Sequence, residues 1–509
     1  QVISRVRAAF RVEIPVETMF ERPTLAALVA AVEQALGEGR REEPEPASEA
    51  SSGEAGGDLS STQQRFWFLD WYQPGSARYN VPVAVRLRGD LDREILRQAL
   101  EDLTARHDAL RTRFETRNSR PVQVIEPPGP WALPVVDLEE PDADERDAQQ
   151  KRLIEEEAER PFDLAGRSLL RTVLLRRSAR DHTLLLTMHH IITDGWSVEV
   201  ILRDLAALYR ARREGGVALP PLSRQYADFS AWEKKWLQGA AYQEHLAYWR
   251  DELAELPPLN LPSVRPRSPR PSQRGAHLPF TLSAELTVSL HRLGKQQGAT
   301  LFMILMAAWQ ALLSRYSDQE DFGVGFPIAN RTQTEFEGVV GCFLNTLVLR
   351  ADLSGDPTFS ELVGRVRARA LKAYAHQAVP FDRLVQELAV RRDPARNPLF
   401  QAMFTLQNAP SSGAAFPGLE MEWVPVKTPT SKVDLTLTAR ERQGRLGGDW
   451  EYSTELFDAS TIQRMAAHFE TLLEAAAADP DQAVADLPLL AADSWDEVLA
   501  MQQGDLQDR

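Results

Sequence analysis

Residues 188–197 read M-H-H-I-I-T-D-G-W-S and bring together side chains that could carry chemistry. His189 and His190 close an apolar stretch, Asp194 follows His190 by four positions, and Gly195 comes directly after it. A histidine at the end of a strand can present a ring nitrogen to a cleft and exchange a proton near neutral pH. A glycine beside it lets a substrate chain approach the backbone closely. A His-His pair taken alone, however, is more typical of two packed histidines before an Asp-Gly turn.

Other kinds of chemistry find little support in the sequence. Cys342 is the only cysteine, which excludes an intrachain disulfide and fits a reducing cytosol. No further histidine or cysteine has ligand spacing near residues 188–197, so we predict no metal site. No serine stands in a G-x-S-x-G pattern, which argues against a serine hydrolase.

The elements that must position these residues alternate between strand and helix patterns. Apolar and alternating stretches predict strands at 81–87, 182–190, 322–326 and 343–349, and two more within 435–450. Helical periodicity predicts helices that begin at Arg93 and cover 197–213 and 300–316. A proline-rich stretch at 255–274 marks a long connection between two blocks. We therefore predict an α/β protein with two lobes of similar size, 59–270 and 271–495.

Composition limits the partners of the chain. It has 509 residues, of which 43% are hydrophobic and 26% charged, and a net charge of −15. This excess of acidic groups argues against a general affinity for nucleic acid or for an anionic membrane, because both need clustered Lys and Arg. There is no apolar run of about 18 residues, so we expect no membrane span. The start at Gln1 does not resemble a signal peptide, and the expected location is the cytoplasm.

The first 58 residues differ from the rest. Residues 1–36 have the apolar spacing of small helices, which is too little material to bury a core of their own. Residues 37–58 are rich in Glu, Pro, Ser, Gly and Ala and contain no large apolar side chain, which predicts a flexible linker. We interpret 1–36 as the end of a truncated domain.

The order H-H-x-x-x-D-G at 189–195 resembles the signature of condensation domains of non-ribosomal peptide synthetases and of related acyltransferases. Six further segments resemble the other condensation-domain motifs and follow in the same order: 60–69, 106–112, 226–232, 340–347, 376–381 and 392–400. Thr62 replaces the usual alanine, and Cys342 and Leu344 are milder departures. The resemblance implies a two-lobed, V-shaped fold like that of chloramphenicol acetyltransferase, with a tunnel between the lobes. It also implies transfer of an acyl or peptidyl group from a carrier-bound thioester to a carrier-bound amine.

The same resemblance assigns residues to the reaction. His190 would accept a proton from the attacking amine or hold that amine in line, and both roles stay open. Gly195 would place a backbone N–H near the developing oxyanion and keep the tunnel open. Asn345 is a candidate hydrogen-bond donor from the second lobe. Trp196 and Ser197 are further candidates to contact the substrate, although Trp196 also suits a core position.

Other residues of the motifs are expected to be structural. Asp194 would form an ion pair with Arg111, or else with Arg106, and so hold the turn after His190. His189 would be a packed strand residue. Cys342 would be a small buried apolar side chain rather than a nucleophile.

The flanking segments also resemble parts of a modular synthetase. Residues 1–36 are similar to the last helices of a peptidyl carrier domain, with Ser4 beyond the attachment point, so the serine that carries 4′-phosphopantetheine would lie upstream of Gln1. Residues 496–509 would begin the linker to an adenylation domain. The implied partners are the upstream and downstream carriers and that adenylation domain.

Three other functions share this signature. A coenzyme A-dependent acyltransferase would lack the carrier-like first 58 residues. A catalytically silent recruiting or docking module usually has a degraded H-H-x-x-x-D-G, whereas this one is intact. An epimerase of the same fold would carry additional motifs. Tyr79-Asn80 and residues 106–112 instead resemble the amide-forming group that accepts an L-configured or achiral donor.

Overall fold

The structure is a computed structural model of the chain. It describes residues 2–10, 12, 14, 18, 24–37, 57–140, 142–216, 219–269, 272, 274–388, 393, 395–407 and 413–490. Most of the predicted linker (38–56), the segment 496–509 and positions 392 and 394 of the last motif lie outside these residues.

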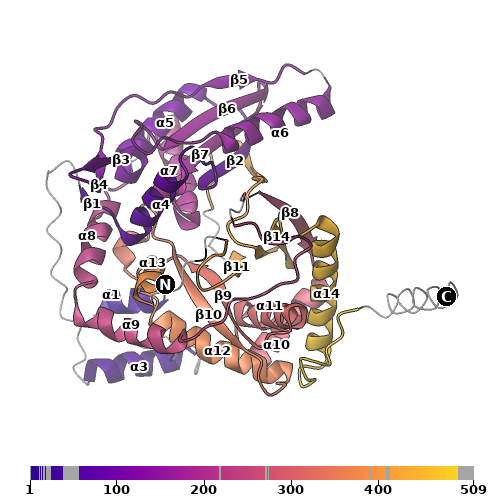
Figure 1. Ribbon diagram of the computed structural model, residues 1–509. Helices are drawn as coiled ribbons and strands as arrows, with labels where there is room; N and C mark the ends of the chain where they lie inside the picture. The colour runs from indigo at the N-terminus through magenta and orange to yellow at the C-terminus, as the bar shows by residue number, and fades with distance from the viewer. Residues whose placement is uncertain are drawn as a thin grey trace.

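The first lobe (Figure 1) is built on a five-stranded sheet with the order β12-β2-β7-β6-β5, in which the edge strand β12 is Leu419–Val424. All neighbours are antiparallel except β5 and β6. Its elements are α4 (Ser61–Tyr72), β2 (Asn80–Gly89), α5 (Arg93–Arg106), β5 (Val135–Asp137), α6 (Ala143–Glu159), β6 (Leu170–Ser178), β7 (Asp181–His189) and α7 (Gly195–Glu214). A small sheet of β1 (Gly57–Asp58), β4 (Arg120–Ile125) and β3 (Thr112–Arg117) lies beside it, and α8 (Tyr226–Trp236) and α9 (Ala240–Glu252) follow α7 in the chain.

Alternation along the strands explains how this sheet is covered on both faces. In β2, Val83, Val85 and Leu87 belong to the core that includes α5 and α7, whereas Ala84 packs with Ile154 of α6. Successive strand residues point to opposite faces, so a strand buried on both sides reads as almost continuously apolar.

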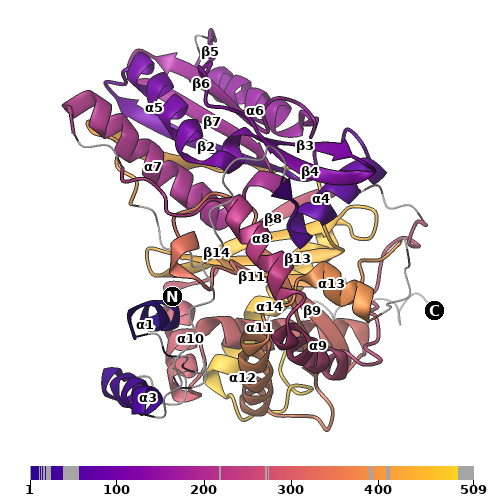
Figure 2. The same cartoon turned by 90° about the vertical axis from the view of Figure 1, so that its left-hand side faces the viewer.

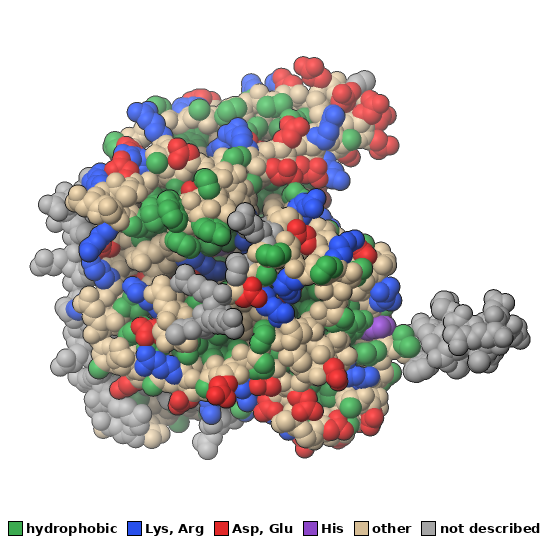
Figure 3. Space-filling model, in the orientation of Figure 1, with side chains coloured by type: hydrophobic (Ala, Val, Ile, Leu, Met, Phe, Trp, Pro, Cys, Tyr) green, Lys and Arg blue, Asp and Glu red, His purple; other side chains and the backbone are tan. Residues whose placement is uncertain are grey.

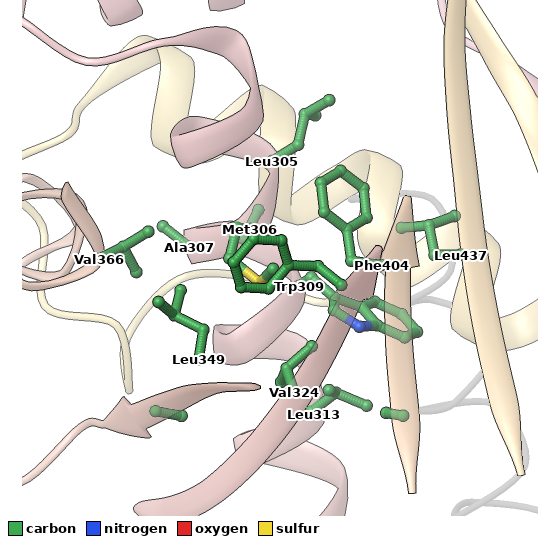
Figure 4. Packing of buried hydrophobic residues seen from close by; sticks show 14 of the residues in the cluster. Leu305, Met306, Ala307, Trp309, Leu313, Val324, Leu349, Val366, Phe404 and Leu437 are labelled. Carbon is green, nitrogen blue, oxygen red and sulfur yellow. The ribbon is translucent and has the colours of Figure 1, made fainter. Parts of the chain in front are cut away.

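The second lobe is built on a six-stranded sheet with the order β10-β9-β11-β13-β14-β8. Its strands are β8 (Gly275–Thr281), β9 (Asp321–Ile328), β10 (Asn345–Asp352), β11 (Ala402–Gln407), β13 (Leu435–Arg442) and β14 (Arg445–Ser453). Its helices are α10 (Ala284–Gln296), α11 (Leu301–Ser317), α12 (Phe359–Ala375), α13 (Phe381–Glu387) and α14 (Ala459–Ala478). Trp309 of α11 lies between α11 and the sheet, close to Phe404 and Leu437, and makes an edge contact with Trp450 (Figure 4).

The two lobes do not separate at residue 270. Strand β12 (Leu419–Val424) comes late in the chain but pairs with β2 of the first lobe over residues 84–89. Residues Tyr242 and Trp249 of α9 belong to the core of the second lobe, and Phe343 belongs to the core of the first. Figure 2 shows the two lobes stacked one above the other, and this exchange of elements ties them together.

The N-terminal helices α1 (Val2–Phe10) and α3 (Leu25–Gly37) form a small cluster of their own around Val12, Ile14 and Val32. Within the described ranges, no single helix combines the length and apolar character needed to cross a membrane. Helices α10 and α11 meet that criterion only as a pair, which is bent by 103°.

Candidate functional site

The histidine pair stands where β7 ends and the chain turns. Asn80 of β2 pairs with His189, and the next backbone N–H, that of His190, donates to the carbonyl of Tyr79 at 2.8 Å. His189 is 2% exposed, and its Nδ1 accepts the N–H of Ile191 at 3.1 Å. His189 is therefore the packed strand residue that the sequence predicts.

His190 is partly exposed and held between the lobes. Its ring stacks on Phe66 of α4, with centroids 5.1 Å apart and an angle of 17°. Its Nδ1 lies 3.7 Å from the sulfur of Cys342, which leaves the Nε2 edge turned away from that residue. Burial and the charge of Lys432 lower the pKa of His190 to about 4, although Asp194 acts in the opposite direction. The imidazole is therefore neutral near pH 7 and can accept a proton or a hydrogen bond.

Asp194 is the N-cap of α7 and is 2% exposed. One carboxylate oxygen accepts the N–H of Ser197 at 2.7 Å and pairs with Arg331 at 3.3 Å. The other accepts the N–H of Phe343 at 2.9 Å. Arg331 comes from the second lobe, and its side chain is as deeply buried as that of Asp194. This carboxylate therefore joins the turn after His190 to the segment that contains Cys342.

The predicted partners of Asp194 are wrong. Arg111 pairs with Asp108 and donates to the carbonyl of Glu126. Arg106 pairs with Asp204 of α7 at 2.9 Å. Both arginines connect the motif at 106–112 to neighbouring residues of the first lobe. They are structural, as expected, but neither contacts Asp194.

Two of the predicted substrate contacts are also wrong. Asn345 is 5% exposed, and its side-chain amide forms hydrogen bonds with backbone groups. Nδ2 donates to the carbonyls of Gln377 and Val379, and Oδ1 accepts the N–H of Phe381 at 2.9 Å. Ser197 is fully buried, and its hydroxyl donates to the carbonyl of Gly341 at 2.8 Å. Both side chains hold loops together and offer nothing to a substrate.

Trp196 and Gly195 differ in exposure. The indole of Trp196 is partly buried and donates to the carbonyl of Glu337 at 2.9 Å. Gly195 is exposed as the first residue of α7, and a Cβ added to it would meet nothing within 4 Å. Its φ is outside the left-handed region, so no backbone strain requires glycine here. The space at Gly195 is therefore open.

The motifs at 60–69, 226–232 and 340–347 meet at the start of α4. Ser60 and Gln63 form a capping box at the start of α4, which explains the polar opening of the first motif. The Ser60 hydroxyl lies 2.8 Å from the Tyr226 hydroxyl, which in turn donates to the carbonyl of Cys342 at 2.6 Å. Arg65 on the same helix pairs with Asp382 of α13 at 3.5 Å. Motifs that are far apart in the chain thus fix Phe66 against His190.

Sequence reasoning missed Arg331 and Phe66. Arg331 follows the predicted strand at 322–326, but nothing in its spacing singles it out from other loop arginines. Phe66 stands inside the first motif, where a polar run is followed by the aromatic run 66–68, and nothing in this pattern distinguishes Phe66 from its neighbours.

Three further observations bound the chemistry. Among the residues that the structure describes, no group of three or more His, Cys, Asp or Glu is arranged to hold a metal. Two surface cavities of the first lobe, around 90–95 and 422–427, do not include His190. The surface is hollowed between the two lobes (Figure 3).

The comparisons with known proteins agree with this geometry. The family model described as Condensation domain matches residues 57–499. A linear gramicidin synthase of Brevibacillus parabrevis is 46% identical over 497 residues, which cover 96% of this chain and 10% of that protein. Bacitracin synthase 3 of Bacillus licheniformis is 36% identical, and the match covers 98% of this chain and 8% of that protein. The chain thus spans about a tenth of the length of these relatives.

Solved structures share the fold. The X-domain from teicoplanin biosynthesis is 31% identical, with a TM-score of 0.80, and the match covers 87% of this chain and 100% of that one. The first condensation domain of the CDA synthetase is 22% identical, with a TM-score of 0.71, over 86% of this chain and 100% of that one. The predicted two-lobed α/β fold is confirmed. This chain belongs to the condensation domain family, the amide-forming acyltransferases of non-ribosomal peptide synthetases.

Proposed function

We propose that this chain forms a peptide bond between two carrier-bound substrates, with His190 as the residue that handles the amine. The observation that carries the proposal is the placement of His190, whose ring stacks on Phe66 and turns its Nε2 edge away from Cys342. Burial lowers the pKa of this ring, which favours its neutral form. A fixed neutral imidazole can accept a proton from an amine or orient it for attack.

The reaction needs few groups from the protein. The α-amine of the acceptor attacks the thioester carbon of the donor, the C–N bond forms, and the C–S bond breaks. The proton lost by the amine passes to the departing sulfur, directly or through Nε2 of His190, and a longer chain remains on the acceptor carrier. Gly195 adds open space at the start of α7, where an exposed backbone N–H can face the developing oxyanion.

The substrates follow from the family. We propose that both arrive on 4′-phosphopantetheine arms of carrier domains, and that the donor is L-configured or achiral, as residues 79–80 and 106–112 suggest. We further propose that residues 1–36 are the end of the upstream carrier and that an adenylation domain follows. The separate cluster formed by α1 and α3 supports a unit distinct from the two lobes.

A second function is favoured by one observation. One of the solved structures that share this fold is the X-domain from teicoplanin biosynthesis, and another is the complex of that X-domain with OxyB. A docking module of this kind would not need His190. The intact histidine, with its buried Asp194 support, favours catalysis instead.

The test is a single-turnover assay with donor and acceptor aminoacyl groups loaded on carrier proteins. We expect amide product from the wild type and a rate about 10²–10⁴-fold lower from His190→Ala, the range for losing a positioned proton-transfer group. His291→Ala is the matched control, because His291 is an exposed histidine on α10 paired with Glu441. Absence of product from the wild type would favour the docking module. Wild-type turnover by His190→Ala at saturating carrier would remove that residue from the mechanism.

A further inference from the structure

The crossover segment, residues 425–434, carries the chain from β12 in the first lobe back to β13 in the second. It lies against the start of β8, the edge strand of the second sheet. The N–H of Gly275 donates to the carbonyl of Pro429 at 3.0 Å, and a Cβ added to Gly275 would lie 2.4 Å from the carbonyl carbon of Thr430. The segment is therefore packed directly on the backbone at the start of this strand.

His277 of β8 joins the crossover segment to the second sheet. Its Nδ1 is hydrogen-bonded to the carboxylate of Asp449 on β14, and its Nε2 lies 2.9 Å from the carbonyl oxygen of Thr428. Both partners are acceptors, because neither a carboxylate nor a carbonyl has a proton to donate. A neutral imidazole has one N–H and can satisfy only one of them, whereas an imidazolium has two. The two contacts together therefore require the protonated, positively charged form of His277.

The charges around His277 favour this protonated form. Besides Asp449, Glu451 of β14 stands opposite His277 in the strand pairing. Two cations act on Asp449: Lys427 of the crossover segment, 3.7 Å from its carboxylate, and Arg440 of β13, through its charge. The core that includes α14 lies on the other face of β8. Burial lowers the pKa of His277, but its hydrogen bond with Asp449 and the two carboxylate charges outweigh this effect and raise the pKa overall.

The crossover segment also connects with the residues beside the proposed site. The N–H of Lys432 donates to Glu451 at 3.0 Å, and its carbonyl accepts from Nη2 of Arg78 at 2.5 Å. Arg78 belongs to the first lobe and precedes Tyr79, whose carbonyl accepts the backbone N–H of His190. Through its two carboxylates, β14 thus holds a segment that the first lobe also contacts.

We propose that His277 is a pH-sensitive link between the crossover segment and the second lobe, which holds Thr428 and Asp449 together as an imidazolium and releases one of them when it loses its proton. The side chain of His277 is 14% exposed, so the proton can pass to solvent. A group whose pKa is raised by folding stabilises the folded form below its unfolded pKa, and this contribution is lost as the pH rises through the folded pKa. The link should therefore be complete near pH 6 and weaken above about pH 6.5. It does not depend on the proposed function.

The experiment is amide hydrogen exchange of the full chain, followed by mass spectrometry from about pH 6 to pH 9. Rates are expressed as protection factors, which removes the intrinsic effect of pH on exchange and leaves the local opening of the structure. In the wild type we expect the protection of peptides that span 425–434 to fall by up to about tenfold over this range, the size expected from the loss of one hydrogen bond. Peptides from the central strand β9 serve as the internal reference and should keep their protection.

Two variants separate the titration of His277 from other effects of pH. His277→Gln keeps a polar side chain but cannot titrate in this range, so the protection of 425–434 should become independent of pH. Asp449→Asn removes the carboxylate that favours the imidazolium, so the fall in protection should begin at lower pH. His291→Gln is the matched control, because His291 is an exposed histidine of the same lobe paired with Glu441, and it should keep the wild-type dependence.

An NMR titration of the His277 ring gives a second readout. The resonance, assigned by its loss in His277→Gln, should titrate above the usual histidine value of about 6.5 in the wild type and at lower pH in Asp449→Asn. A wild type in which the protection of 425–434 stays constant over this range would overturn the inference, and this measurement needs no variant. A folded His277→Gln that keeps the wild-type dependence would overturn it as well.

Discussion

Replacing Asp194 by alanine is the sharpest test of how the site is held together. The carboxylate satisfies three buried groups at once: the N–H of Ser197, the N–H of Phe343 and the guanidinium of Arg331. Its removal leaves all three without that partner. Arg331 keeps its bonds to the carbonyls of Phe336 and Val339 and to the hydroxyl of Ser197, so its charge does not become wholly uncompensated.

The size of the effect follows from these contacts. Loss of an N-cap costs about 1 kcal/mol, a buried N–H without an acceptor about 1–3 kcal/mol, and a buried charge that loses its partner about 3–5 kcal/mol. These costs overlap, and the remaining bonds of Arg331 reduce the last one. We expect Asp194→Ala to lower the free energy of unfolding by about 4 kcal/mol, a large part of the roughly 5–15 kcal/mol that stabilises a typical domain.

The assay is urea denaturation followed by fluorescence and circular dichroism, with activity measured on the same samples. Asp92→Ala is the matched control, because Asp92 is an exposed N-cap of α5 whose carboxylate accepts the N–H groups of Glu94 and Ile95. It should cost about 1 kcal/mol. Combining Asp194→Asn with Arg331→Met should cost less than the sum of the two single changes. An Asp194→Ala protein with an unchanged midpoint and no activity would refute the structural role and point to a direct one.

Three other predictions follow from the site and its surroundings. Gly195→Ala should be stable and active, because a Cβ there meets neither backbone strain nor a neighbouring atom. Gly195→Leu should block turnover of carrier-bound substrates. Equal rates for the two variants would show that the phosphopantetheine arm does not pass this residue. Burial lowers the pKa of His107 and lowers that of His189 to about 3. Below about pH 6.5 the unfolded chain binds protons that the folded chain does not, so the free energy of unfolding should fall by about 1.4 kcal/mol per pH unit for each histidine. A urea midpoint that stays constant from pH 7 to 5 would contradict this. A chain extended upstream of Gln1 should accept one phosphopantetheine from a transferase, and labelling of the present chain at Ser4 would exclude the carrier assignment.

Much of the fold could be predicted because local patterns determine it. The apolar stretch at 182–190 became β7, and the periodic stretch at 197–213 became most of α7. Both follow from side-chain spacing, which needs no knowledge of distant contacts. His189 and Cys342 are both buried, as the sequence analysis expects for a packed strand residue and a small apolar side chain.

The pairing of Asp194 could not be read from spacing. Several loop arginines could have reached it, and the choice depends on how a loop of the second lobe folds over the start of α7. The position of β12 in the first sheet could not be predicted either, because it also depends on tertiary contacts. Residues 419–424 alternate as a strand should, but only the tertiary structure pairs them with β2 rather than with the nearer β13. The amide of Asn345 was misjudged because its acceptors, Gln377 and Val379, lie more than 30 residues away.

These contacts explain why the family motifs are so many and so widely spread. Asp194, Asn345 and Tyr226 use their polar groups in hydrogen bonds with backbone atoms of other motifs, whereas His190 and Gly195 are the residues that we propose to meet the substrate. A reaction that needs mainly positioning demands that two lobes hold His190 in one place. Each buried bond between them therefore acts on the rate through geometry. Substitutions at these supporting residues should lower stability and activity together.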